Sequence, residues 1–380
     1  MQIEGFSCPT GVSQEDIQRL TMFWNNLDEQ MSSLFDLNLV PESVLISSFA
    51  FCILVRNEGI QSNAMVANLI QRIKYEERCL RECVVIEDVP QHPGMLGIEF
   101  PRKDETPLDV QNLKAEIQTA DYQLPIVLGE SSLGKPVIVD IADLMMLSIM
   151  GGDTCEQDNL IPFFDELSKI RDNSYWKYVM ITGNGLTWDS VMPKSHIWKN
   201  GVVCLDSGNT NVWQKNYKMV MNELERELDV RLRLLSSLGV ESIEKLNYQS
   251  RVRLPHILVF AVDICNGLEE RIEEAFYGDY FELMSPESKK AGIHLVLVDF
   301  KPRPDLYHEW GSVMAAANGL YGHDGNVGRI MITWHWDDAV NSMLSIGGPE
   351  AIKYGWNKFL YRSPHNEFFR IKTPTVLKQE

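Results

Sequence analysis

The chain has 380 residues, of which 44% are hydrophobic and 23% charged, so it is long enough for two domains and can bury a sizeable core. Its 53 acidic and 35 basic residues give a net charge of −18, which disfavours non-specific binding to DNA, RNA or an anionic membrane surface. The seven scattered cysteines favour a reducing compartment, and the lack of a leader-like stretch or of an apolar run of about 20 residues predicts a cytoplasmic protein with no membrane span.

The N-terminal part alternates helix-like and strand-like patterns. Residues 1–13 are expected to be a loose N-terminus, and Ser13 as a cap with Asp16 in the first turn marks a helix start. Apolar residues at helical spacing continue this helix to about Leu37. Further elements are expected as a strand or strand pair at 43–55, a helix at 62–83, and strands at 84–86 and 97–100. Together they predict a small α+β domain over residues 14–105.

Residues 106–380 alternate apolar strands with helices. Helices are expected at 107–120, 214–237 and 267–276, and strands at 124–128, 136–141, 145–150, 178–181, 201–205, 257–262, 293–298, 329–334 and 358–361. Gly239 is suited to close the long helix. Continuous apolar strands separated by helices are typical of a mainly parallel sheet covered on both faces, so the sequence predicts an α/β domain.

Two glycine motifs in this domain resemble phosphate-binding loops. The first, Gly129-x-x-x-x-Gly134-Lys135, lacks the hydroxyl that holds Mg²⁺ because Pro136 follows the lysine. A strand pattern comes next where a P-loop needs a helix. We therefore interpret its glycines as turn residues of a hairpin.

The second motif follows the apolar run at 145–150, and a helix-like pattern begins at Leu160. Strand, glycine turn and helix form the frame of a P-loop, G-x-x-x-x-G-K-[ST]. Counted from Gly151, the second glycine is Glu156, the lysine is Gln157 and the hydroxyl residue is Asp158. We define the loop remnant as Gly151, Gly152, Asp153, Thr154, Cys155, Glu156, Gln157 and Asp158. Taken alone, this stretch also fits an ordinary polar turn.

Several stretches, in order along the chain, resemble the FtsK/SpoIIIE family of DNA translocases. They are Gly97–Pro101, Leu124–Asp143, Asn222–Asn247, Lys290–Leu297, Arg329-Ile330 and Gly348–Glu350. The resemblance implies that residues 14–105 correspond to the family's α subdomain and residues 106–380 to its RecA-like β subdomain. It does not extend to the family's C-terminal winged-helix DNA reader.

Every catalytic position that the resemblance implies departs from the family pattern. Asp263 stands where the second acidic motif is expected, but Ile264 replaces the carboxylate that orients the attacking water. Phe300 replaces the polar sensor amide, and Asn341 stands where the family has arginine. Phosphoryl transfer depends on a positioned lysine, Mg²⁺, a water-orienting group and often an arginine. No catalytic residue, metal or cofactor is therefore expected.

The resulting hypothesis is an FtsK-like protein with dismantled nucleotide motifs, acting as a non-hydrolysing structural or regulatory subunit of a translocase-like assembly. Its expected partners are copies of itself or active FtsK-like subunits. One alternative is an ATP-driven translocase of double-stranded DNA with an atypical nucleotide site, which would need ATP and Mg²⁺. Another is a DNA-binding ring protein without ATPase activity, which the net charge disfavours.

Other polar clusters have simpler interpretations. Cys79 and Cys83 have the spacing of half a zinc site on a predicted helix, but no matching Cys/His pair follows, and ordinary core or surface cysteines are expected. Cys155 lies beside acidic residues that disfavour a reactive thiolate. An acidic pocket of Glu156, Asp158, Asp263 and Asp299 could hold a divalent cation, although an inert remnant fits as well. The segment 334–338 is open as a partner surface or as buried core.

Overall fold

The fold is known from a computed structural model. It describes residues 12–57, 62–76, 83–87, 89–106, 108, 117, 121–150, 161–182, 192–204, 210–250, 253–262, 285–299, 327–331, 358–365 and 367–372. The chain divides into two compact units. Unit 1 comprises residues 1–114, 128–137 and 366–374, and unit 2 comprises residues 115–127, 138–365 and 375–380. The domain boundary expected at residues 105/106 stays a prediction.

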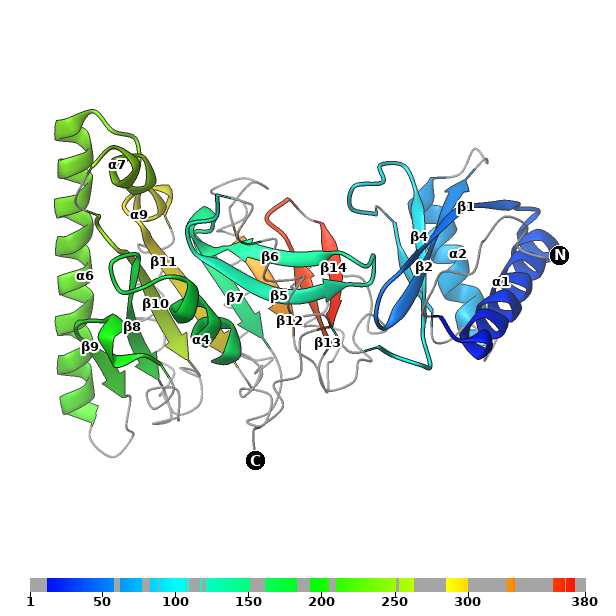
Figure 1. The fold of residues 1–380 in the computed structure, drawn as a ribbon, viewed down its shortest axis with the longest axis horizontal. Helices are drawn as coiled ribbons and strands as arrows, with labels where there is room; N and C mark the ends of the chain where they lie inside the picture. Colours follow the sequence, from blue (N-terminus) through cyan, green and yellow to red (C-terminus); the bar gives the residue numbers. More distant parts are fainter. Residues whose placement is uncertain are drawn as a thin grey trace. The chain divides into compact units, whose positions relative to one another are not determined.

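Unit 1 is built on an antiparallel sheet of order β1-β2-β4-β3 (Figure 1). Its elements are α1 (Gln14–Phe35), β1 (Leu39–Ile46), β2 (Ala50–Asn57), α2 (Asn63–Glu76), β3 (Val84–Ile86) and β4 (Leu96–Pro101). Of the two alternatives for residues 43–55, a strand or a strand pair, the structure has the pair, β1 and β2. The expected helix at 62–83 is too long, because α2 ends at Glu76 and Cys83 directly precedes β3 outside a helix.

Helix α1 begins where the sequence places its cap. The Ser13 hydroxyl accepts a hydrogen bond from the Asp16 backbone N–H at 3.1 Å. The helix ends two residues earlier than expected, because Asp36 adopts a left-handed conformation and its N–H bonds back to the last turn. The inward face of α1 carries Leu20, Phe23, Trp24, Leu27 and Met31.

Strand β2 is apolar from Ala50 to Val55 because both of its faces are covered there. Phe51, Ile53 and Val55 point into the core beneath α1 and α2. The alternate residues Cys52 and Leu54 point to the other face, where Leu133 and Val89 pack on them. Since side chains alternate along a strand, an unbroken apolar run needs a cover on both sides.

The hairpin of β5 (Pro125–Ser131) and β6 (Pro136–Asp140) explains the first glycine motif. Gly134 has a φ of +73°, and a Cβ there would lie 2.4 Å from the Ile46 carbonyl oxygen. Gly129 approaches strand β14 (Phe368–Lys372) just as closely, with a Cβ 2.1 Å from the Lys372 oxygen. The hairpin interpretation is therefore confirmed.

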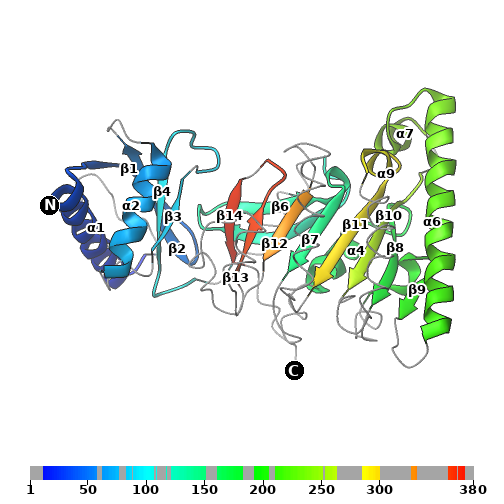
Figure 2. The same ribbon diagram turned by 180° about the vertical axis from the view of Figure 1, so that it is seen from behind.

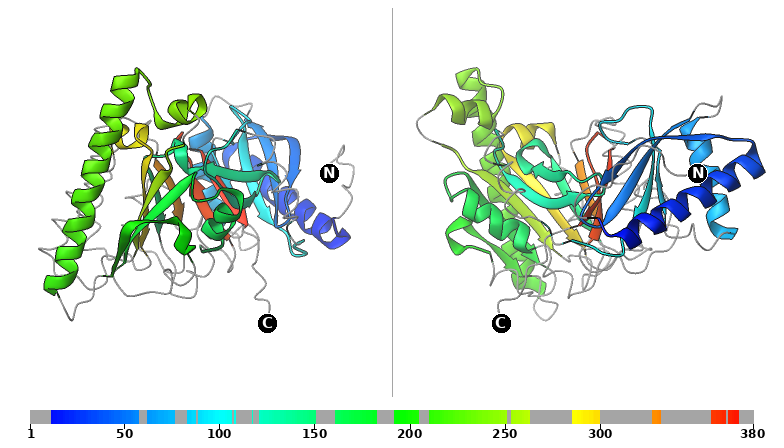
Figure 3. Two further views of the ribbon diagram at one scale, coloured as in Figure 1. Left: turned by 60° about the vertical axis from the view of Figure 1, so that its left-hand side comes forward. Right: turned by 45° about the vertical axis from the view of Figure 1, so that its right-hand side comes forward.

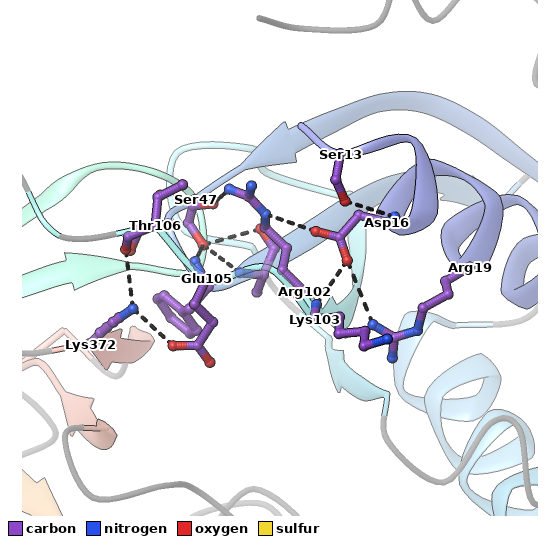
Figure 4. A network of polar contacts seen from close by, with 12 residues as sticks. Ser13, Asp16, Arg19, Ser47, Arg102, Lys103, Glu105, Thr106 and Lys372 are labelled. Atoms are coloured by element: carbon purple, nitrogen blue, oxygen red, sulfur yellow. Dashed lines mark hydrogen bonds and ion pairs between the residues drawn. The ribbon is translucent and has the colours of Figure 1, made fainter. Parts of the chain in front are cut away.

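A buried polar network joins α1 to the end of β4 (Figure 4). Asp16 accepts from the Lys103 N–H at 2.8 Å and pairs with the Arg102 guanidinium at 3.4 Å. Arg102 also donates to the Ser47 carbonyl oxygen at 2.8 Å. These bonds satisfy charges that would otherwise be costly to bury. Beside them, Lys372 pairs with Glu105 at 2.8 Å.

Unit 2 contains the parallel sheet (Figure 2). Its strands are β7 (Met146–Met150), β8 (Trp176–Thr182), β9 (Ile197–Cys204), β10 (His256–Val262), β11 (Ile293–Asp299), β12 (Val327–Met331) and β13 (Lys358–Arg362). They are hydrogen-bonded in the order β13-β12-β7-β11-β10-β8-β9, and only β13 runs antiparallel. The predicted RecA-like α/β architecture, preceded by a small α+β part, is confirmed.

Four helices are described in unit 2, and they lie around this sheet. They are α4 (Ile161–Ile170), α6 (Thr210–Leu238), α7 (Ile243–Gln249) and α9 (Pro286–Lys290), with short 3-10 turns at Ile141–Asp143 and Lys194–His196. Figure 3 shows α6 rising along the β9 edge. Gly239 follows it with a φ of +64°, as predicted. In the part of the chain that the structure describes, no helix is both long and apolar enough to cross a membrane.

Some expectations lie outside the described residues. These are the helix at 267–276, the segment 334–338 and nearly all of the helix at 107–120. Strand β14 has no counterpart among the predicted elements.

Candidate functional site

The candidate site is the edge of the unit 2 sheet at which the parallel strands end. Strand registers place one residue from each of five neighbouring strands in a single row. The row consists of Ile330, Ile149, Val298, Val262 and Thr182. Ligands of open α/β sheets bind outside the carboxyl ends of the strands. This edge is therefore where a nucleotide site would be built.

The sequence attaches the predicted site positions directly to this edge. The loop remnant 151–158 follows β7, Asp263 and Ile264 follow β10, and Phe300 follows β11. These positions and Asn341 lie outside the described residues, so their roles stay predictions. The structure does show that β11 has β7 on one side and β10 on the other. The strands that lead into three of the predicted motifs are thus direct neighbours.

The frame around the loop remnant has the order that a P-loop requires. Strand β7 ends at Met150 and helix α4 begins at Ile161. Phe164 of α4 packs edge-to-face on Phe260 of β10, with ring centroids 4.8 Å apart. Helix α4 therefore packs on the sheet, and the predicted strand before the loop remnant and helix after it are confirmed.

The segment that leads into β7 makes two sets of buried hydrogen bonds. Asp140 accepts backbone N–H bonds from Gln123 at 2.6 Å, Leu124 at 2.8 Å and Ala142 at 3.1 Å. Burial raises the pKa of Asp140, and the three N–H bonds oppose that rise. The second set is a hydrogen bond at 2.6 Å between His294 Nδ1 and the Leu144 carbonyl oxygen. Together they hold the segment 140–144, which leads into β7.

His294 also belongs to a buried pair of imidazoles. Because its Nδ1 must donate to Leu144, a neutral His294 accepts at Nε2, where His256 Nδ1 lies 3.0 Å away. Burial lowers the pKa of His294 to about 4 and that of His256 well below its usual value. Both residues lie near the amino ends of β10 and β11, at the edge opposite the candidate site. We therefore assign the pair to structure.

Sequence reasoning missed one polar group at the candidate edge. Thr182 ends β8, is 2% exposed, and its hydroxyl has no hydrogen-bond partner among the described residues. The predicted strand at 178–181 stopped one residue short of it. A polar residue ending an apolar run of a parallel sheet was the signal that could have identified it.

The remaining sequence candidates do not form a site in the described part. Cys83 is buried at 1% exposure, whereas Cys79 and Cys155 lie outside the described residues. No group of three or more potential metal ligands occurs among the residues that the structure covers. Of the predicted acidic pocket, only Asp299 falls on a described strand.

No family model matches the sequence. Among solved structures, the cytoplasmic domain of the Type VII secretion ATPase EccC from Thermomonospora curvata matches with a TM-score of 0.53 and 14% identity, over 68% of this chain and 29% of that chain. This chain therefore has the fold of the FtsK/SpoIIIE-type motor ATPases.

Two further structures give similar matches. The pCW3 conjugation coupling protein TcpA, in its monomer form with ATPγS, has a TM-score of 0.49 and 13% identity, over 94% of both chains. EssC from Geobacillus thermodenitrificans has a TM-score of 0.49 and 14% identity, over 67% of this chain and 45% of that chain. This chain thus spans less than half of the EccC and EssC chains that it matches. The FtsK-type fold is established, and activity and partners are matters for proposal.

Proposed function

We propose that this protein is a non-hydrolysing subunit of a translocase-like assembly. The proposal rests chiefly on one observation: β7 and α4 frame the loop remnant as a P-loop is framed, yet its key positions are Glu156, Gln157 and Asp158. The scaffold that positions nucleotide chemistry is kept while the groups that perform it are absent.

The chemistry of these positions opposes ATP. A P-loop lysine and hydroxyl neutralise the phosphates and hold Mg²⁺. A carboxylate about 4 Å from a phosphate charge would instead be repelled by about 4 kcal/mol at an effective dielectric constant of about 20. Ile264, Phe300 and Asn341 remove the other groups that phosphoryl transfer uses.

For partners, we propose copies of this chain or an active FtsK-like subunit. EccC, whose fold this chain shares, is described as a Type VII secretion ATPase, which supports a place in a translocase-like assembly. The net charge of −18 favours contact with proteins over contact with DNA. We place this assembly on the cytosolic side, as the scattered cysteines suggest.

The test is a calorimetric titration with ATP and Mg²⁺ of the full chain and of a variant whose P-loop is rebuilt. Glu156→Gly, Gln157→Lys and Asp158→Thr together restore the consensus from Gly151. We expect no heat from the wild type at millimolar ATP and measurable binding by the triple variant.

Pro136→Thr provides a matched control. It completes the consensus of the first motif, but β6 follows in place of a helix, so no ATP binding should appear. Binding of ATP by the wild type would overturn the proposal. In that case, turnover stimulated by duplex DNA would support a working translocase. DNA binding with a steep salt dependence and without turnover would support a DNA-binding ring protein.

A further inference from the structure

Helix α6 carries a second apolar surface that faces away from the unit 2 core. Its inward face is buried through residues such as Leu224 and Leu235. Large apolar side chains are nevertheless exposed elsewhere along it. They are Val212 at 52%, Met219 at 43%, Val230 at 60%, Leu234 at 36% and Leu238 at 55%. Most other large apolar residues of the described chain are buried, so this concentration on one helix indicates an interaction surface.

The exposed residues are aligned along the helix. With about 3.6 residues per turn, Val212 and Val230 are separated by about five turns and fall on one line. Met219 lies eleven residues before Val230, or about three turns, and falls on the same line. Glu223 and Arg226 lie between Met219 and Val230 on this side of the helix. We call these five residues the α6 stripe.

Four residues of the α6 stripe are symmetric about the bond between Leu224 and Glu225, and Val212 lies beyond this symmetric part. Met219 lies five residues before this point and Val230 five residues after it. Glu223 lies one residue before Leu224, and Arg226 lies one residue after Glu225. An apolar residue is thus matched by an apolar residue, while an acidic residue is matched by a basic one.

We propose that the α6 stripe binds the α6 stripe of a second copy of this chain, antiparallel about a two-fold axis. In this arrangement Met219 of one copy faces Val230 of the other, twice by symmetry. Glu223 likewise faces Arg226, giving two ion pairs of opposite charge at the centre. A two-fold interface requires such a self-complementary patch. The antiparallel direction also places the positive end of each helix dipole beside the negative end of the other, which is favourable.

The surroundings of the stripe suit this pairing. A hollow of about 530 Å³ lies along the flank of α6. The residues lining it are Gln214, Lys215, Lys218, Met219, Asn222, Glu223 and Arg226. In the proposed dimer, Val230 of the second copy would contact Met219, which lines this hollow. Arg226 has no ion pair among the described residues, and Glu223 pairs only loosely with Lys199 at 3.8 Å. Both charges are therefore available to a partner.

The experiment is sedimentation velocity of the full chain over a range of concentrations, without nucleotide. We expect a monomer–dimer equilibrium. Met219→Glu and Val230→Glu should each raise the dimer Kd by roughly tenfold or more, because each places a charge at two symmetric apolar contacts. Met22→Glu is the matched control: Met22 is 66% exposed on α1, outside the stripe, and should leave the dimer Kd unchanged.

Charge reversal tests the orientation. Arg226→Glu alone should weaken the dimer, because it opposes two acidic residues at the centre. Glu223→Arg added to it should restore the dimer, since the pairs are then reversed but still opposite. A monomer at all concentrations would overturn the proposal, as would a larger ring, a dimer insensitive to the stripe variants, or a double variant that fails to recover. Because nucleotide is absent, this outcome is independent of the proposed loss of ATP binding.

Discussion

At the scale of single residues, the His256–His294 pair predicts how the protein responds to acid. Both imidazoles are buried and neutral, and the pKa of His294 is lowered to about 4. Arg231 and Lys289 add positive charge nearby, so a protonated imidazole would be repelled. The pair can therefore be held only in its neutral form.

The sign of the pH effect follows from this. An unfolded histidine has a pKa near 6.5, so below that pH it binds a proton that the buried, folded histidine does not bind. The stabilisation is thus fully present above about pH 6.5 and is lost as pH falls toward 4, by about 3 kcal/mol for His294 alone. Denaturant unfolding of the protein at pH 7.5 and pH 5 should show about 2 kcal/mol of this loss.

His256→Phe should reduce that pH dependence, because one titrating imidazole is replaced by a ring of similar size. His365→Gln serves as a control, since His365 is exposed and should leave the slope unchanged. If the free energy of unfolding of His256→Phe kept the same pH dependence, the histidine pair would not be its source. The sequence shows two histidines 38 positions apart, and only the parallel pairing of β10 with β11 brings them into contact.

At the scale of elements, the β5–β6 hairpin shows why a glycine motif need not bind phosphate. Gly134 turns the chain with positive φ directly against the Ile46 carbonyl. Ser132 and Lys135 of the same turn are used in contacts to Glu99 and Gln91. Each conspicuous residue of the motif has a structural task within unit 1.

Gly134→Ala should destabilise unit 1 by more than the roughly 1 kcal/mol expected for a strained φ, because its Cβ would also meet backbone. Gly94→Ala is the matched control, with a φ of +78° and nothing within 4 Å of a Cβ. It should cost only the strain. Equal losses in the free energy of unfolding for the two variants would contradict the close approach.

The sequence predicted most elements correctly because their signals are local. Val262 ends a short run of apolar residues whose length favours a buried strand, and Ser13 marked the start of α1 through its own hydroxyl. Strand β14 escaped prediction because Arg370 and Lys372 are polar but buried, at 9% and 7% exposure. Their partners come from residues far away in the sequence, so no local pattern reveals their burial.

At the scale of the whole molecule, unit 1 is completed by residues from the far end of the chain. Arg370 of β14 pairs with the fully buried Glu99 of β4 at 2.5 Å. The Ser132 hydroxyl also donates to Glu99. Burial raises the pKa of Glu99, and the arginine and serine oppose that rise. The carboxylate therefore depends on a residue more than two hundred positions away.

Arg370→Leu should destabilise unit 1 by about 3–5 kcal/mol at pH 7, because it leaves a buried carboxylate without its counter-charge. The effect should shrink in acid, since Glu99 with its raised pKa can then bind a proton. Adding Glu99→Gln to the variant should recover part of the loss. Hydrogen exchange of β2 and β4 measures the change. Additive losses in the double variant would show that the pair is not coupled.

The sequence by itself determined the FtsK-like resemblance, the order of apolar strands and the changed residues at the positions that this resemblance implies to be catalytic. These features depend on residue identity and local spacing, so they can be inferred from the sequence alone. The tertiary structure decided which strands are neighbours at the candidate edge, that Arg370 neutralises Glu99, and that α6 presents an exposed symmetric stripe. Each of these depends on packing between distant segments, because burial and pairing are set by the folded neighbours of a residue and not by its neighbours in sequence.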